Sequence, residues 1–125
     1  GLPALLRAVK LQKRAARVGF DWPSAENVLE KIAEESRELV EARDAGTPDE
    51  QMEEFGDLLF AMANLARRLK IDPEAALRDA NTKFTRRFMW IEAALVNDNR
   101  RPEDSTLEEM DALWDRAKIQ EKKSL

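Results

Sequence analysis

The sequence of 125 residues contains neither cysteine nor histidine, and these two absences narrow the chemistry that the chain can perform. Without cysteine there is no disulfide framework, no thiolate nucleophile and no zinc–thiolate site. Without histidine a serine–histidine triad is excluded, and so is a ferritin-like di-iron site, which needs Glu-x-x-His pairs. Any reaction must therefore rely on carboxylates, a metal ion, water and the basic side chains of lysine and arginine.

Glycine is also scarce, with 4 residues, while 37% of the residues are charged and 43% are hydrophobic. This composition is typical of a globular, all-helical protein with solvated outer faces, and we expect residues 1–125 to form a single domain. No apolar run approaches the roughly 20 residues of a membrane span, and no signal peptide is visible, so we expect a cytoplasmic protein without a membrane partner. The net charge of -4 argues against nucleic acid as a partner.

Four or five helices with short connections are predicted, because no segment alternates with period two as a strand would. Ser24 and Thr47 are expected to be N-caps, and Gly46 a left-handed helix stop. Ser105 with Glu108 forms an expected capping box. The fold predicted is all-α, a four- to five-helix bundle with no sheet. The predicted helices cover about residues 3–17, 25–44, 47–70, 73–96 and 105–121.

The predicted helix over residues 47–70 is apolar on most of its sides, which indicates a central position in the fold. Its broad apolar stripe consists of Phe55, Leu58, Leu59, Met62, Ala66 and Leu69. Ala61 and Leu65 extend the apolar surface to a second side. Glu54 and Asp57 lie beside them, so we expect these two carboxylates to face protein or a cleft.

Two carboxylate clusters interrupt the otherwise apolar helices, and they consist of Glu34, Glu35, Glu38, Glu54 and Asp57. At about 100° per residue, Glu35 falls on the apolar face of its helix, and Glu38 lies at the edge of that face. The link at residues 46–48 is short, so the two helices must run antiparallel as neighbours. The two acidic faces can then meet.

Facing carboxylates predict an all-oxygen site for a hard divalent metal, most simply magnesium, because buried like charges are costly without a cation. Magnesium binds few carboxylates and keeps waters and substrate phosphates, which indicates phosphate chemistry. The alternative is a solvated acidic face, and periodicity alone leaves both interpretations open. The solvated face is favoured for Glu30, Glu41, Glu50 and Glu53.

The spacing Glu34-Glu35-x-x-Glu38, then 15 residues, then Glu54-x-x-Asp57 resembles the motif of the MazG-type all-α nucleoside triphosphate pyrophosphohydrolases. The segments 11–22, 56–61 and 64–67 also resemble that family. Asn81-x-Lys83-Phe84-x-x-Arg87-Phe88 is similar to its phosphate-binding helix, and Trp114-x-x-x-Lys118 to its closing helix. The resemblance is best to the C-terminal domain of tandem members. One motif set without an internal repeat favours an excised domain or a naturally short member.

The resemblance implies an enzyme that hydrolyses nucleoside triphosphates, ribo- or deoxyribo-, to nucleoside monophosphate and pyrophosphate. Its cofactor would be Mg²⁺, with Mn²⁺ as a substitute, and it would form a homodimer or a higher homo-oligomer. The implied metal ligands are Glu35, Glu38, Glu54 and Asp57. Glu34 and Glu38 are the implied catalytic carboxylates. The implied substrate-binding residues are Lys83, Arg87 and Lys118 for the triphosphate, Asn81, and Trp22 or Trp114 for stacking on a base or ribose.

Alternatives to this function stay open. A dUTP- or phosphoribosyl-ATP-specific pyrophosphohydrolase would share the acidic motif and differ in base recognition. A non-catalytic helical module for nucleotide sensing or protein interaction is a third hypothesis, although a pure scaffold gains nothing from carboxylates in its apolar stripes. The tryptophans fit a packed core or interface equally well, and Lys83 with Arg87 also fits a solvated basic face.

Overall fold

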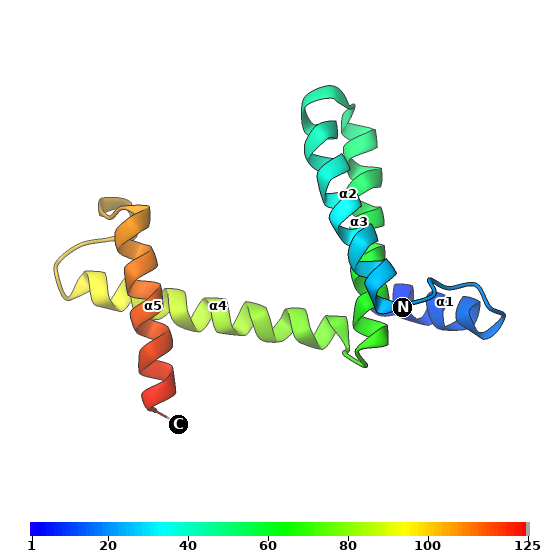
Figure 1. Cartoon of the computed structure of the whole chain (residues 1–125). Coiled ribbons are helices and arrows are strands. Elements are labelled where there is room, and N and C mark those ends of the chain that lie inside the picture. Colours follow the sequence, from blue (N-terminus) through cyan, green and yellow to red (C-terminus); the bar gives the residue numbers. More distant parts are fainter. Residues whose placement is uncertain (125) are drawn as a thin grey trace. The chain divides into compact units, whose positions relative to one another are not determined.

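The computed structural model describes residues 1–124, which form five α-helices and one short 3₁₀ helix (Figure 1). Within this range no strand occurs, which confirms the predicted all-α class. No helix in the described part of the chain has both the length and the apolar character needed to cross a membrane. The elements are α1 (Ala4–Arg17), α2 (Ala25–Ala45), α3 (Pro48–Arg68), α4 (Pro73–Val96), η1 (Pro102–Asp104) and α5 (Leu107–Lys123).

The chain divides into two compact units, Gly1–Ala76 and Leu77–Leu125. In the first unit, α3 packs against both α1 and α2, which gives it the central position predicted for it. The second unit has its own small core on α4 and α5, formed by Ile91, Leu95 and Leu113. That residues 1–125 form a single domain stays a prediction.

Side-chain caps set the beginnings of the helices. The Ser24 hydroxyl accepts a hydrogen bond from the Asn27 amide at 3.2 Å, and the Thr47 hydroxyl caps α3 in the same way, so both predicted N-caps are confirmed. The predicted capping box at Ser105 is wrong. The Ser105 amide closes the 3₁₀ turn of η1, and Thr106 caps α5 instead.

Gly46 does not adopt the left-handed conformation predicted for it, because its φ of -100° lies in the ordinary extended region. Close approach explains the glycine instead: a Cβ at this position would lie 2.8 Å from the carbonyl oxygen of Ala42. The left-handed residues after helices are Gly19, with φ of 87°, and the non-glycine residues Lys70 and Asn99.

The broad apolar stripe of α3 is largely exposed, although the helix is central in its unit. Phe55, Leu59, Met62 and Leu69 are all exposed, whereas Ala61, Ala63 and Asn64 are buried. The physical reason is that α1 and α2 pack against the sides of α3 that carry small residues, where helices can approach closely. The larger apolar side chains are left on the outer side of the unit.

Two glycine-to-alanine substitutions distinguish a glycine that is needed for a close steric contact from one that only adds backbone flexibility. Gly46→Ala should lower the free energy of unfolding by about 1 to 3 kcal/mol, because its methyl group would be forced against the Ala42 carbonyl. Gly56→Ala, inside α3 with open space around its Cβ position, should raise that free energy by about 0.5 to 1 kcal/mol. Urea unfolding followed by circular dichroism measures both, and equal effects of the two substitutions would contradict this account.

Candidate metal centre and adjoining cavity

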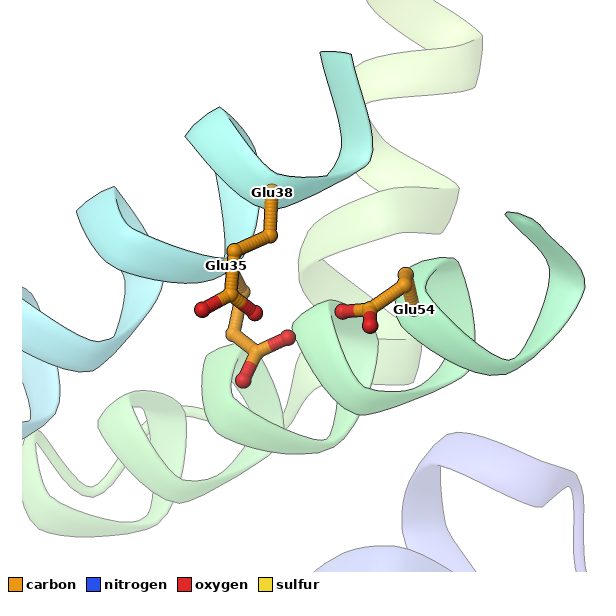
Figure 2. A group of neighbouring side chains, drawn as sticks. All are labelled: Glu35, Glu38 and Glu54. Atoms are coloured by element: carbon orange, nitrogen blue, oxygen red, sulfur yellow. The ribbon is translucent and has the colours of Figure 1, made fainter. Parts of the chain in front are cut away.

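Three carboxylates converge where α2 packs against α3, as Figure 2 shows. We call Glu35, Glu38 and Glu54 the acidic cluster, and one oxygen from each lies within 4.8 Å of the others. Oxygens around a single magnesium ion lie about 3 to 4 Å apart, because the Mg–O distance is about 2.0 to 2.1 Å. Small side-chain rotations would close the cluster to that size, so these residues could hold a divalent cation.

Glu35 is the most deeply placed member of the acidic cluster, with only 5% of its surface exposed. Its Oε1 accepts a hydrogen bond from the Lys31 ammonium group, whose Nζ lies 2.9 Å away. Its Oε2 is also buried, yet no N–H or O–H group within residues 1–124 donates to it. Because a buried charged oxygen without a partner is strongly unfavourable, this atom fits a site that a cation completes.

The electrostatics of the cluster favour a cation as well. The hydrogen bond from Lys31 lowers the pKa of Glu35, although burial acts in the opposite direction. Contact with the Glu35 carboxyl raises the pKa of Glu54, as do its burial and the neighbouring negative charges. Loss of hydration and then the charges of Glu35 and Glu34 raise the pKa of Glu38. A divalent ion between these carboxylates would lower their pKa values, because its charge favours their ionised forms.

The other two predicted carboxylates lie beside the acidic cluster without belonging to it. Glu34 is half exposed, and its Oε1 lies 3.8 Å from the Lys31 Nζ. Asp57 is exposed and lines the adjoining cavity together with Lys31 and Glu35. Their roles as a catalytic group and a metal ligand stay predictions.

A cavity of about 700 Å³ opens next to Glu35 in the first unit. Its volume falls within the range of about 300 to 1,000 Å³ that is usual for small-molecule sites. Aromatic rings and charged groups form its wall, among them Phe20, Trp22, Phe60, Lys31, Glu35 and Asp57. The predicted substrate-binding residue Trp22 therefore shares a cavity with a member of the acidic cluster, and this combination suits a ligand with both an aromatic and a charged part.

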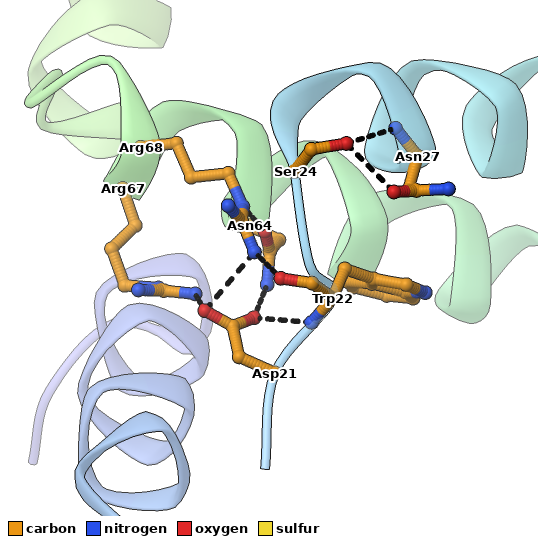
Figure 3. Close-up of polar contacts among 7 residues, drawn as sticks. All are labelled: Asp21, Trp22, Ser24, Asn27, Asn64, Arg67 and Arg68. Carbon is orange, nitrogen blue, oxygen red and sulfur yellow. Dashed lines mark hydrogen bonds and ion pairs between the residues drawn. The ribbon is translucent and has the colours of Figure 1, made fainter. Parts of the chain in front are cut away.

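The backbone at Trp22 is held by a polar network centred on Asp21 (Figure 3). Oδ1 of Asp21 accepts hydrogen bonds from the Trp22 amide at 2.9 Å and from Asn64 Nδ2 at 3.0 Å. Its Oδ2 pairs with the guanidinium groups of Arg67 and Arg68. Arg68 also donates to the Trp22 carbonyl and to the side chain of Asn64. The loop that carries this cavity wall is thus tied to α3 at several points.

Sequence reasoning missed the roles of Lys31 and of this network. The signal for Lys31 was present, since a lysine four residues before a glutamate shares a helix face with it. Asn64, Arg67 and Arg68 likewise share one face of α3. Their partner Asp21 is 43 residues away from Asn64, and no local pattern indicates such a pairing.

In the second unit, the predicted phosphate-binding residue Arg87 is engaged with other side chains. Its Nη2 lies 3.1 Å from Oε2 of Glu121, and its guanidinium lies 5.1 Å from the ring centroid of Trp114. Hydrogen bonds from Arg87 and from Arg86 lower the pKa of Glu121 to about 2. Arg87 is therefore not part of a freely solvated basic face, and Trp114 contributes to the packing of its unit.

The remaining predicted substrate-binding residues, Asn81, Lys83 and Lys118, are exposed in the second unit. Asn81 lines a second depression together with Thr82, Thr85 and Arg86. All of these assignments stay predictions.

The helical fold and the acidic cluster define the class: an all-α protein with a carboxylate site able to hold a metal ion. Residues 23–91 match the MazG nucleotide pyrophosphohydrolase domain, and the chain belongs to this family. The predicted family resemblance is thereby confirmed.

Several curated proteins are similar to the chain over most of its length. The nucleoside triphosphate pyrophosphohydrolase/pyrophosphatase MazG of Thermotoga maritima is 48% identical over 117 residues, 94% of this chain and 45% of the relative. The nucleoside triphosphate pyrophosphohydrolase of Escherichia coli K12 is 46% identical over 122 residues, 96% of this chain and 46% of the relative. YabN of Bacillus subtilis is 49% identical over 71 residues, 57% of this chain and 14% of the relative. The chain spans about half the length of the first two relatives.

Asp21→Asn should destabilise the protein through the network around Trp22. Burial alone would raise the pKa of Asp21, but hydrogen bonds from Asn64 and Arg67 lower it from 3.8 to about 2. A lowered folded-state pKa means that the charged form stabilises the fold above pH 3.8 and that this stabilisation is lost as the pH falls towards 2.

We therefore expect Asp21→Asn to cost about 1 to 2 kcal/mol at neutral pH, and we expect the difference from the parent to shrink in acid. Urea unfolding at several pH values measures it. Asp44→Asn, which removes an exposed carboxylate paired only with the neighbouring Arg43, is the control. A difference that does not change with pH would rule out the charged network as its cause.

Proposed function

We propose that the chain hydrolyses nucleoside triphosphates to nucleoside monophosphate and pyrophosphate, with magnesium as cofactor. The observation that carries this proposal is the buried Oε2 of Glu35, which lacks a donor and belongs to the acidic cluster beside a ligand-sized cavity. Membership of the MazG family supports the reaction, as do the printed names of the relatives from Thermotoga maritima and Escherichia coli.

The acidic cluster would hold the ion, and Asp57 at the cavity wall would be its fourth protein ligand. A bound magnesium ion neutralises phosphate charge and lowers the pKa of a coordinated water. Manganese(II) favours the same oxygen ligands and would substitute for it. The positive charge of the ion would keep the carboxylates of the acidic cluster ionised, and the ionised carboxylates would in turn hold the ion in place.

One carboxylate would take the proton from the attacking water, and the candidates are Glu34 and Glu38. Glu38 belongs to the acidic cluster, so its carboxylate would lie beside a water bound to the same ion. Glu34 is half exposed and lies beside the cluster, with its Oε1 3.8 Å from the Lys31 Nζ. The water oxygen would bond to the α- or the β-phosphorus as the P–O bond between the two phosphates breaks. Attack at the α-phosphorus expels pyrophosphate and attack at the β-phosphorus expels the nucleoside monophosphate, so the products are the same in both cases.

The substrate would be held through its base and its phosphates. Trp22 presents an aromatic ring to the cavity and would stack on a base or ribose. Lys83, Arg87 and Lys118 would bind the triphosphate, with Asn81 and Trp114 as further contacts. For Arg87, phosphate oxygens would replace the Glu121 carboxylate, because both offer charged acceptors to the same guanidinium group.

Glu38→Ala should abolish magnesium-dependent release of pyrophosphate, with a loss of at least about 100-fold, since a site that holds its metal poorly loses several kcal/mol of transition-state stabilisation. Glu41→Ala removes an exposed carboxylate from the same helix and should leave the rate unchanged. Both variants should keep the helical circular dichroism of the parent. A Glu38→Ala variant that stays active without metal would refute the assignment.

The preferred base is tested with a panel of ribo- and deoxyribonucleoside triphosphates that includes dUTP, with phosphoribosyl-ATP beside them. Release of pyrophosphate is measured with magnesium and with chelator. Turnover of several triphosphates supports the proposal, whereas turnover of dUTP or phosphoribosyl-ATP alone would support a specialised relative. No turnover of any nucleotide would favour a non-catalytic module.

A second copy of this chain is the proposed partner of α3. A row of apolar side chains on α3 recurs in alternating steps of three and four residues, the spacing of a helix-packing seam, and all but the half-buried Ala66 are exposed: Met52, Phe55, Leu59, Met62, Ala66 and Leu69. Met52 is 77% exposed and Leu69 is 57% exposed, which is unusual for a continuous apolar row in water. Pairing with the same row of another copy would bury both.

Met62→Glu should convert an oligomer into a monomer, because it places a charge in the middle of this row. Sedimentation velocity measures the mass. Val18→Glu is the control, since Val18 is 84% exposed and lies outside α2 and α3. A parent protein that is itself monomeric, or a variant that keeps the parent's mass, would contradict pairing through α3.

A further inference from the structure

We propose that Lys31 is a built-in counter-cation of the acidic cluster: its ammonium group compensates Glu35 in the metal-free protein and competes with the divalent ion for that carboxylate. The inference rests on the metal site of the proposed function, and it assigns a role to a residue outside the predicted ligand set. Lys31 would lower the affinity for metal while it stabilises the empty site.

The position of Lys31 supports this role. Its Nζ lies 2.9 Å from Oε1 of Glu35 and 3.8 Å from Oε1 of Glu34, one turn away on the same helix. Among residues 1–124, no other basic side chain lies within ion-pair distance of the acidic cluster. One lysine thus faces several carboxylates, and it pairs with the member that is most deeply buried.

The two oxygens of Glu35 have different roles: one accepts a hydrogen bond from the Lys31 ammonium group, and the other is available to a divalent metal ion. Oε1 is occupied by the ammonium group of Lys31, whereas Oε2 is buried and receives no hydrogen bond from the described residues 1–124. A divalent ion at Oε2 would therefore sit within a few ångströms of the Lys31 charge and be repelled by it. A neighbouring unit charge at such a distance changes the binding of a proton to a carboxylate by about 10- to 1,000-fold, and a divalent ion responds at least as strongly.

The side chain of Lys31 is able to leave Glu35. It is 37% exposed, and its flexible stem ends at the cavity, so the ammonium group can move into solvent when a metal ion arrives. Without Lys31, Glu35 would be a buried carboxylate with no compensating charge, and the empty protein would be less stable. Removal of the Lys31 charge should therefore raise the affinity for metal and lower the stability of the metal-free protein.

The test replaces Lys31 and measures metal binding without any nucleotide. Lys31→Met removes the charge and keeps the length of the side chain. Lys31→Arg keeps the charge, and Arg37→Met removes a charge from an exposed position on the same helix. Isothermal titration with magnesium, electron paramagnetic resonance of free manganese(II), and thermal unfolding with chelator or with magnesium are measured for all four proteins at pH about 8, where carboxylates are ionised.

Lys31→Met should bind either ion at least about tenfold more tightly than the parent. It should unfold at a lower temperature in chelator and gain a larger increase in that temperature from magnesium. Lys31→Arg and Arg37→Met should resemble the parent in both measurements. If Lys31→Met does not fold in chelator, Lys31→Gln, which can still donate to Glu35 without a charge, should show the same gain in affinity with a smaller loss of stability.

Equal or weaker metal binding by Lys31→Met and Lys31→Gln would overturn the inference, because a competing cation would then not be what Lys31 supplies. Failure of the parent protein itself to bind magnesium or manganese would overturn the metal site on which the proposed function depends. The two failures are therefore distinguished by the parent's own titration.

Discussion

The burial of one ionised carboxylate, Glu35, is the constraint on which the rest of the first unit depends. A charge of this kind is tolerated at the α2–α3 contact only with a cation beside it, and Lys31 supplies one at a single oxygen. The second oxygen has no donor within residues 1–124, and the Glu35 carboxylate lies close to further carboxylates from both helices. The packing of α2 on α3 therefore does more than bury apolar surface, because it brings together charges that repel one another until a positive ion joins them.

Local chemistry made the helices predictable from the sequence. The N-caps at Ser24 and Thr47 depend only on neighbouring residues, so patterns in the sequence indicate them correctly. The acidic cluster was largely predictable for a similar reason, since helical periodicity and a short turn bring its members together. The network around Asp21 could not be predicted in this way, because its partners on α3 are distant in the sequence.

The apolar stripe of α3 shows a second limit of prediction from the sequence. Periodicity correctly indicated that this helix is apolar on two sides and central in its unit, but not which side packs within the unit. Small residues such as Ala61 and Ala63 allow the closest approach, so they pack against α1 and α2, while the larger side chains stay outside. In the second unit, Arg87 shows a related limit: its pairing with Glu121 depends on how α5 meets α4, which helical spacing alone does not determine.

The turn between α2 and α3 lies at one end of this helix pair (Figure 1). Glu38 precedes the end of α2, and Glu54 follows the beginning of α3, by about two turns in each case, a distance of roughly 10 Å along the axis. Lengthening the connection at Gly46 and Thr47 would therefore extend the hairpin tip without altering the register of the acidic residues. This tip is accordingly a permissive point for grafting a reporter peptide, and a place where related chains can differ in length while keeping the same chemistry.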